Sequence, residues 1–238
     1  MMPTPASLLP PSENKRLATL RSYDILHSLQ EPLFTEVVEV IATLYNVPIS
    51  LIALVDADEV EYKAVHGLPG LRSQPRAEAI CAMAIKQQQP IVFPDLSFSH
   101  ALTAEAAAAA QAKGLVFYAG VPLWMPNRHC IGTLCIIDKQ SRTFSTPEER
   151  MLEQFAYLVG RLIAVRQYCR AGQAAGEEYW SVVRTELTLE VQALRLLVRN
   201  IVRYVGTHIP VHADVLEAVD NHLNDLRWRL ADYYSGPL

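Results

Sequence analysis

Hydrophobic and polar residues repeat along this 238-residue chain with two different periods. In the first 45 residues, apolar positions recur every three or four residues, which predicts two helices separated by a break at 29–32. From Pro48 the period changes. The apolar run 48–55, the polar turn 56–59 and the alternating segment 60–66 predict a strand, a turn and a partner strand.

The middle of the chain continues as a mixture of strands and helices. After a loop at 67–75, the pattern predicts a short helix at 76–88, a strand at 91–93 and an alanine-rich helix at 103–113. Residues 115–124 and 130–137 predict a second hairpin. Thr146 then starts a helix as its N-cap, with Pro147 at the first helical position and a glutamate at the third. The fold class is therefore α+β, with a central antiparallel sheet flanked by helices over residues 12–172.

The C-terminal part, 177–238, is purely helical. Two apolar seams alternate spacings of three and four, and the break between them contains Gly206 and Pro210, which predicts a helical hairpin. The first seam is Leu187, Val191, Leu194, Val198, Ile201 and Val205, and the second is Leu216, Val219, Leu223, Leu226 and Leu230.

Further apolar residues lie off the first seam, at Val182, Leu189, Leu196 and Leu197. A helix with two apolar sides needs more than one neighbour, and a two-helix hairpin cannot bury both sides alone. We therefore expect a homodimer in which two hairpins form a four-helix bundle through the seams, and in which replacing Leu194 and Ile201 with glutamate gives monomers.

Composition excludes several classes of protein. The net charge of −4 and the interspersed arginines argue against a nucleic-acid binder. The Pro-rich residues 1–11 are expected to be a disordered tail without the features of a signal peptide, and no apolar stretch is long enough to span a bilayer. The four cysteines form no C-x-x-C pair, so we expect a cytoplasmic, reduced protein without membrane contact.

Four segments together resemble GAF domains of bacterial sensor proteins. They are Asn14–Leu26, Pro48–Asp56, Phe117–Leu123 and Ile131–Asp138, in the order and spacing of that family, and the resemblance covers residues 12–170. It implies a ligand pocket on one face of the sheet. Signatures of the kinase, diguanylate cyclase and phosphodiesterase domains that often follow GAF domains are missing from the sequence.

The resemblance implies a non-enzymatic signalling module. In this interpretation the GAF domain senses a small ligand or a redox state, and the helix 147–172 transmits the change to the dimerising hairpin, which can also dock to a signalling partner. The ligand and any cofactor stay unknown. Two alternatives are open: a scaffold with a degenerate, ligand-free GAF domain, and a thiol-dependent enzyme similar to the GAF proteins that reduce free methionine sulfoxide.

The period of two along strand 117–124 separates its side chains into two faces. Phe117 and its alternate neighbours are uniformly apolar and suit packing on the terminal helices, whereas the other face suits a pocket. The candidate ligand-binding residues are Cys81, Phe93, Asp95, Tyr118, Gly120, Pro122, Trp124 and Cys135. Gly120 is expected to leave room for a ligand, and the polar segment 94–104 is expected to form a lid.

Cys81 occupies a helix that, in the related sensors, covers the pocket; Met83 stands where those relatives carry a histidine, so no covalent tetrapyrrole is expected. An inert buried Cys81 is the simplest interpretation, and a redox-active thiol is the alternative. Cys130 and Cys135 are five residues apart and point to opposite faces of a regular strand, so we predict no metal site.

Overall fold

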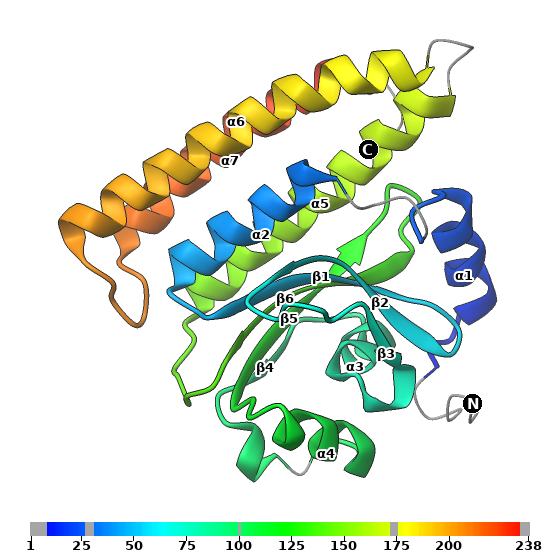
Figure 1. Cartoon of the computed structure of the whole chain (residues 1–238), viewed down its shortest axis with the longest axis vertical. Coiled ribbons are helices and arrows are strands. Elements are labelled where there is room, and N and C mark those ends of the chain that lie inside the picture. Colours follow the sequence, from blue (N-terminus) through cyan, green and yellow to red (C-terminus); the bar gives the residue numbers. More distant parts are fainter. Residues whose placement is uncertain (1–8, 27–30, 100, 172–175, 234–238) are drawn as a thin grey trace.

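The computed structural model describes residues 9–26, 31–99, 101–171 and 176–233, so most of the expected N-terminal tail lies outside the described residues. It contains a six-stranded antiparallel sheet in the order β3-β2-β1-β6-β5-β4. Helices cover both faces of this sheet (Figure 1). The predicted α+β fold class is confirmed.

The strands are β1 (Ile49–Val55), β2 (Glu59–His66), β3 (Ser73–Pro75), β4 (Ile91–Phe93), β5 (Phe117–Trp124) and β6 (Cys130–Asp138). The helices are α1 (Glu13–Ser22), α2 (Pro32–Tyr45), α3 (Ile80–Gln87), α4 (Ala104–Ala112), α5 (Thr146–Ala171), α6 (Gly176–Val205) and α7 (Ala213–Tyr233), with 3₁₀ turns η2 (Arg76–Glu78) and η3 (Leu96–Phe98).

The sheet divides the interior into two cores, and the parity of β5 decides which residue enters which core. Phe117, Ala119, Val121 and Leu123 belong to the core shared with α2 and α5. Tyr118 belongs to the opposite core, under α3 and α4. The division inferred from the period of two is therefore confirmed.

Local differences from the predicted elements have simple causes. The expected helix 76–88 is split at Ala79, whose extended backbone (φ −97°, ψ 121°) separates η2 from α3. Part of the expected loop 67–75 forms the edge strand β3. The N-cap of α5 is one residue earlier than predicted: Glu148 accepts from the backbone N–H of Ser145 at 2.7 Å and donates its own N–H to the Ser145 hydroxyl at 3.4 Å, which is a capping box.

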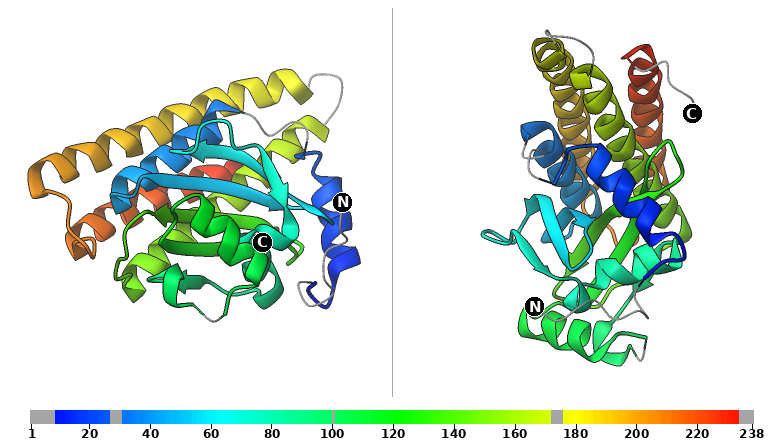
Figure 2. Two further views of the ribbon diagram at one scale, coloured as in Figure 1. Left: turned by 60° about the horizontal axis from the view of Figure 1, so that its bottom comes forward. Right: turned by 90° about the vertical axis from the view of Figure 1, so that its right-hand side faces the viewer.

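The C-terminal hairpin forms an outer layer over the sheet-bound helices α2 and α5. Helix α6 packs on α2 and α5, and α7 packs on α5. Figure 2 shows α6 and α7 on the side of the molecule away from α3 and α4. The chain therefore stacks α6 and α7 on α2 and α5, these on the sheet, and the sheet on α3 and α4.

This layering differs from the expected dimer seam. Nine seam residues are buried inside the chain's own core, namely Leu187, Val191, Leu194, Val198, Leu216, Val219, Leu223, Leu226 and Leu230. Ile201 is half-buried and Val205 is exposed. The seam was expected to contact a second chain, but it contacts helices of the same chain, and the hairpin has no core of its own.

Two buried carboxylates fasten the outer layer to the rest of the chain. Glu31, the N-cap residue of α2, accepts from Arg166 Nε on α5 at 2.5 Å and from Trp180 Nε1 on α6 at 3.0 Å. Glu148, fully buried, accepts from the backbone N–H of Val211 in the α6–α7 connection at 3.1 Å. These bonds join segments that are distant in sequence, so they fix the position of the hairpin.

Among the helices of the described residues, none combines the length and the apolar character that a membrane span requires.

Candidate functional site

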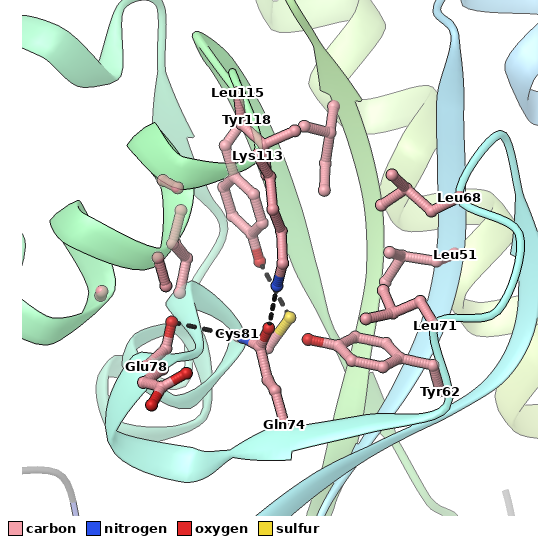
Figure 3. A pocket seen from close by; sticks show the side chains of 15 residues that line it. Leu51, Tyr62, Leu68, Leu71, Gln74, Glu78, Cys81, Lys113, Leu115 and Tyr118 are labelled. Atoms are coloured by element: carbon pink, nitrogen blue, oxygen red, sulfur yellow. Dashed lines mark hydrogen bonds between the residues drawn. The ribbon is translucent and has the colours of Figure 1, made fainter.

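A pocket lies between the sheet and the helices α3 and α4, where the candidate pocket was expected (Figure 3). Its volume is about 40 Å³, enough for a short aliphatic group. Four strands contribute its floor through Leu51, Tyr62, Tyr118 and Ile137. Its roof comes from Ile80, Cys81, Ala106, Ala109 and Ala110 on α3 and α4, and Leu68, Leu71 and Leu115 close its sides.

The small side chains of α4 make this cavity possible. Thr103 caps the helix by accepting from the backbone N–H of Ala106 at 3.2 Å, and alanine has the highest helix propensity. The helix is therefore stable although it presents almost no side-chain volume to the sheet. The space that larger residues would fill is left to the pocket.

Polar groups gather at the rim of the pocket. Lys113 Nζ donates to Gln74 Oε1 at 2.6 Å, and Gln74 Nε2 donates to the backbone carbonyl of Glu78 at 3.2 Å (Figure 3). The Lys113 ammonium has a neutral amide as its partner here, and the Glu78 side chain also lines the pocket. The rim thus offers one cationic and one anionic group above apolar walls.

A cluster of two thiols and two hydroxyl groups lies at the inner end of the pocket. The Sγ atoms of Cys81 and Cys135 are 3.6 Å apart. The Tyr118 hydroxyl lies 3.1 Å from Cys135 Sγ and donates to Cys81 Sγ at 3.6 Å, and the Thr133 hydroxyl lies 3.0 Å from Cys135 Sγ. All four residues are buried, so the sulfur atoms interact mainly with one another and with these hydroxyls.

Gly120 explains why Tyr118 reaches these sulfurs. In the sheet, Gly120 is the register partner of Cys135 and stands two residues from Tyr118, on the same face. Because Gly120 has no Cβ, the phenol of Tyr118 can lie across it toward Cys135. A Cβ at this position would be 2.3 Å from the Tyr118 hydroxyl oxygen.

The pKa values of the two thiols in this cluster shift in opposite directions. The hydrogen bond with Cys135 lowers the pKa of Cys81 to about 7; burial opposes this, and bonds with Thr133 and Tyr118 support it. Burial and the neighbouring Cys81 raise the pKa of Cys135. Burial and the two cysteines likewise raise the pKa of Tyr62 and of Tyr118, with Glu78 adding to the effect on Tyr62. Cys81 is therefore the more acidic thiol of the pair, and Cys135 the less acidic one.

The other candidate residues lie elsewhere. The ring of Phe93 packs on Tyr118 at 6.4 Å between centroids, and Asp95 caps η3 by accepting from the Ser97 N–H at 2.9 Å. Trp124 is 40% exposed, and Pro122 is buried in β5 away from the lining. The room expected beside Gly120 is filled by Tyr118. Of the expected set, Cys81 and Tyr118 line the pocket and Cys135 lies directly behind them.

The expected lid does not cover this pocket. Residues 94–99 and 101–104 contribute none of the lining, and position 100 lies outside the described residues. The rim of the pocket is instead formed by Gln74, Glu78 and Lys113, which were not among the residues predicted from the sequence. Tyr62 was also missed, because the register of β2 shifts at Lys63 and places Tyr62 and Ala64 on opposite faces, which a regular alternation does not predict.

No group of three or more histidine, cysteine, aspartate or glutamate side chains within the described ranges is arranged to hold a metal ion.

Substituting Gly120 tests the packing of the sulfur cluster. Gly120→Ala is expected to lower the free energy of unfolding by about 1–3 kcal/mol, because the new methyl group must displace the Tyr118 phenol. Urea denaturation measures this loss. In the double variant Tyr118→Leu/Gly120→Ala the clash is absent, so its loss should be smaller than the sum of the two single losses. Additive losses would show that the phenol does not occupy this space.

A family model described as GAF domain matches residues 30–163. A cyclic di-GMP phosphodiesterase of Pseudomonas aeruginosa is 28% identical over 151 residues, which cover 63% of this chain and 25% of that protein, so the chain spans a quarter of the relative's length.

Among solved structures, the GAF domain of an Acinetobacter phosphoenolpyruvate-protein phosphotransferase is 22% identical, with a TM-score of 0.48, over 63% of this chain and 94% of that one. A type II free methionine-R-sulfoxide reductase from Thermoplasma acidophilum is 15% identical, with a TM-score of 0.48, over 57% and 95% of the two chains.

Proposed function

Because the chain belongs to the GAF domain family, we propose that it is a sensory module whose pocket between the sheet and α4 binds a small apolar molecule with one anionic and one cationic group. GAF domains are commonly signalling modules, and the similarity to part of a cyclic di-GMP phosphodiesterase supports a signalling role. In this proposal the chain acts by binding rather than by catalysis.

The rim of the pocket carries the proposal about the ligand. Apolar walls favour an apolar body, whereas charged groups at a partly exposed rim favour opposite charges on the ligand. Lys113 can exchange its neutral Gln74 partner for an anion, and Glu78 can accept a cation. An apolar α-amino acid combines these features, with its side chain between Leu51 and Ala109 and its head group at the rim.

A matched set of ligands tests this assignment. L-Leucine is expected to bind more tightly than 4-methylpentanoate, which lacks the ammonium group, or isoamylamine, which lacks the carboxylate. Lys113→Met should weaken leucine binding by about tenfold or more, because a charge-assisted hydrogen bond contributes about 1.5–3 kcal/mol. Isothermal titration calorimetry measures the three affinities, and valine, isoleucine and methionine extend the series.

Two alanines on α4 provide the control. Ala109 lines the pocket, so Ala109→Leu should fill it and abolish binding. Ala108 is exposed on the same helix, and Ala108→Leu should leave binding unchanged. If no apolar amino acid binds, or if the two variants bind equally well, the proposed site is wrong and the scaffold alternative gains support.

The packing of β2 supports a path from the pocket to the outer helices. Tyr62 on β2 lines the pocket, while Ala64 on the same strand joins the opposite core, where α2 packs on β2. Helix α2 in turn contacts α6, where Arg195 pairs with Glu36 at 2.9 Å and with Glu39 at 3.0 Å. A shift of Tyr62 on ligand binding would therefore reach the hairpin through α2 rather than through α5 alone.

We also propose a homodimer, through a surface different from the expected seam. The outward side of α6 exposes Val182, Leu189 and Leu196 at seven-residue intervals, with exposed fractions of 54%, 61% and 57%. These apolar residues form one line along the solvent-facing side of a long helix, which we call the α6 stripe. A row of exposed apolar residues on one side of a long helix is a candidate interaction surface.

Charge favours a second copy of the chain in antiparallel orientation. The exposed side of α6 carries Glu178 and Glu186 in its N-terminal half, and Arg199 and Arg203 in its C-terminal half. A two-fold axis at Leu189 would bring each acidic half opposite the basic half of the other copy, whereas a parallel pair would oppose like charges. The α6 stripe is thus self-complementary, as an isologous dimer requires.

A second candidate function is a thiol-dependent reductase of free methionine sulfoxide. The observation that favours it is the presence of two thiols 3.6 Å apart at the inner end of the pocket. Turnover of free methionine sulfoxide with a dithiol reductant, lost in Cys81→Ser and in Cys135→Ser, would support this candidate over a binding module.

A further inference from the structure

We propose that Cys81 and Cys135 form a reversible disulfide when a peroxide enters the pocket, which makes this pair an oxidative modification site. This inference deepens the proposed function, since it would give the same pocket a second input. It rests on the thiol cluster alone and does not require that an amino acid binds.

The first argument is proximity. The two sulfur atoms belong to α3 and β6, 54 positions apart in the sequence, and lie 3.6 Å from each other. A disulfide bond is about 2 Å long. Closing the remaining distance needs a movement of roughly 1.5 Å, which side-chain rotation and a small shift of the first turn of α3 can supply.

The second argument is reactivity. The thiolate is the nucleophilic form of cysteine, and Cys81 lies in the first turn of α3, where backbone N–H groups favour negative charge. The titratable groups facing Cys81 are Cys135, Tyr118, Tyr62 and Glu78, from β6, β5, β2 and η2. Tyr118 donates a hydrogen bond to the Cys81 sulfur, and the raised pKa of Cys135 keeps its thiol protonated beside it.

The third argument is access. Cys81 lines the pocket, and hydrogen peroxide is small enough for a cavity of about 40 Å³. Cys130, in contrast, is fully buried and bonded to the carbonyl of Gly132 at 3.3 Å, and burial raises its pKa to about 12. Cys130 therefore serves as an unreactive control thiol in the same chain.

The chemistry balances with a peroxide as the oxidant. The Cys81 thiolate attacks one peroxide oxygen, an S–O bond forms, the O–O bond breaks, and the leaving hydroxide takes a proton to become water. Cys135 then loses its proton and attacks the sulfur of the Cys81 sulfenic acid. The S–S bond forms, the S–O bond breaks and a second water leaves. Two thiols are oxidised by two electrons, and a dithiol reductant reverses the change.

The test is peptide mapping of the full chain after exposure to hydrogen peroxide and quenching with N-ethylmaleimide. Trypsin yields residues 77–86, with Cys81, and residues 129–139, with Cys130 and Cys135. We expect these peptides to be linked in the wild type and in Cys130→Ala, and separate in Cys81→Ser and Cys135→Ser. In Cys135→Ser, Cys81 should accumulate as a sulfenic acid that dimedone traps.

The rate should follow the ionisation of Cys81. Because the thiolate population grows as pH rises through about 7, oxidation should accelerate from pH 5.5 to 8 and then level off. The Cys130 thiol, whose pKa burial raises to about 12, stays protonated at pH 7, so Cys81 should react at least about tenfold faster than Cys130.

Two results would overturn the proposal. One is an unlinked pair of peptides in the wild type at complete peroxide consumption, and the other is a Cys81 that reacts no faster than Cys130. Both readouts use the wild type, so they hold even if a serine variant folds poorly. Because no amino acid is added, a negative leucine titration leaves this test standing, and a negative peptide map leaves the binding proposal standing.

Discussion

Replacing Glu148 with alanine is expected to lower the free energy of unfolding by about 3–5 kcal/mol, because the change removes one partner of a buried ion pair. Glu148 Oε1 accepts from Arg142 at 3.2 Å and from the Val211 N–H at 3.1 Å, and its Oε2 accepts from the hydroxyl of Ser145 at 2.8 Å. Without the carboxylate, the Arg142 guanidinium is left buried without its acid, and the backbone N–H of Ser145 loses its acceptor in the capping box of α5.

The neighbouring residue supplies the control. Glu149 is only partly buried, and Glu149→Ala should stay within about 0.5 kcal/mol of the wild type. Urea denaturation measures both variants, and hydrogen exchange of Glu148→Ala should show faster exchange in the α6–α7 connection, where Val211 loses its acceptor. Equal losses for the two variants would mean that Glu148 does not fasten the hairpin.

The second large effect distinguishes the two sides of α6. Leu194 is 1% exposed, so Leu194→Glu should cost several kcal/mol by burying an unpaired carboxylate, and should open α6 and α7 to protease. Leu189 is 61% exposed, so Leu189→Glu should leave the free energy of unfolding nearly unchanged. It should instead weaken the dimer about a hundredfold or more, because like charges meet at the two-fold axis.

Sedimentation velocity and urea denaturation measure these two properties separately. A charge reversal tests whether the two α6 helices are antiparallel. The double variant Arg199→Glu/Arg203→Glu should weaken an antiparallel dimer, and adding Glu178→Arg and Glu186→Arg should restore it. A wild-type monomer at micromolar concentration would contradict the dimer proposal. If Leu194→Glu dissociated the dimer without lowering the free energy of unfolding, the result would support a dimer interface through the seam, as first predicted from the sequence.

The helical part shows how far sequence alone can go. Spacings of three and four in α6 and α7 correctly indicated two amphipathic helices with one buried side each. They could not indicate the neighbour, because a hydrophobic seam packs equally well on a second chain or on helices of the same chain. The apolar residues off the seam gave the better indication of a surface for a second chain. Three of them, Val182, Leu189 and Leu196, are exposed in the structure.

The pocket shows a similar limit. Parity correctly assigned Tyr118 to the face under α4, because its alternate neighbours Phe117, Ala119, Val121 and Leu123 lie in the opposite core. It could not reveal that the Tyr118 ring lies across Gly120, since that depends on a rotamer and on the cross-strand partner Cys135. The rim residues Gln74, Glu78 and Lys113 come from three separate segments, and only the folded chain brings them together.

Hydrogen–deuterium exchange with and without saturating L-leucine tests the central claim of ligand sensing most directly. Slower exchange is expected at the rim and roof of the pocket, in residues 74–81 and 106–115, and a change is expected along α2 and α6, the proposed path to the outer surface. Ala109→Leu should show neither effect. Unchanged exchange at the rim in the wild type, or the same response in Ala109→Leu, would contradict a sensor that works through this pocket.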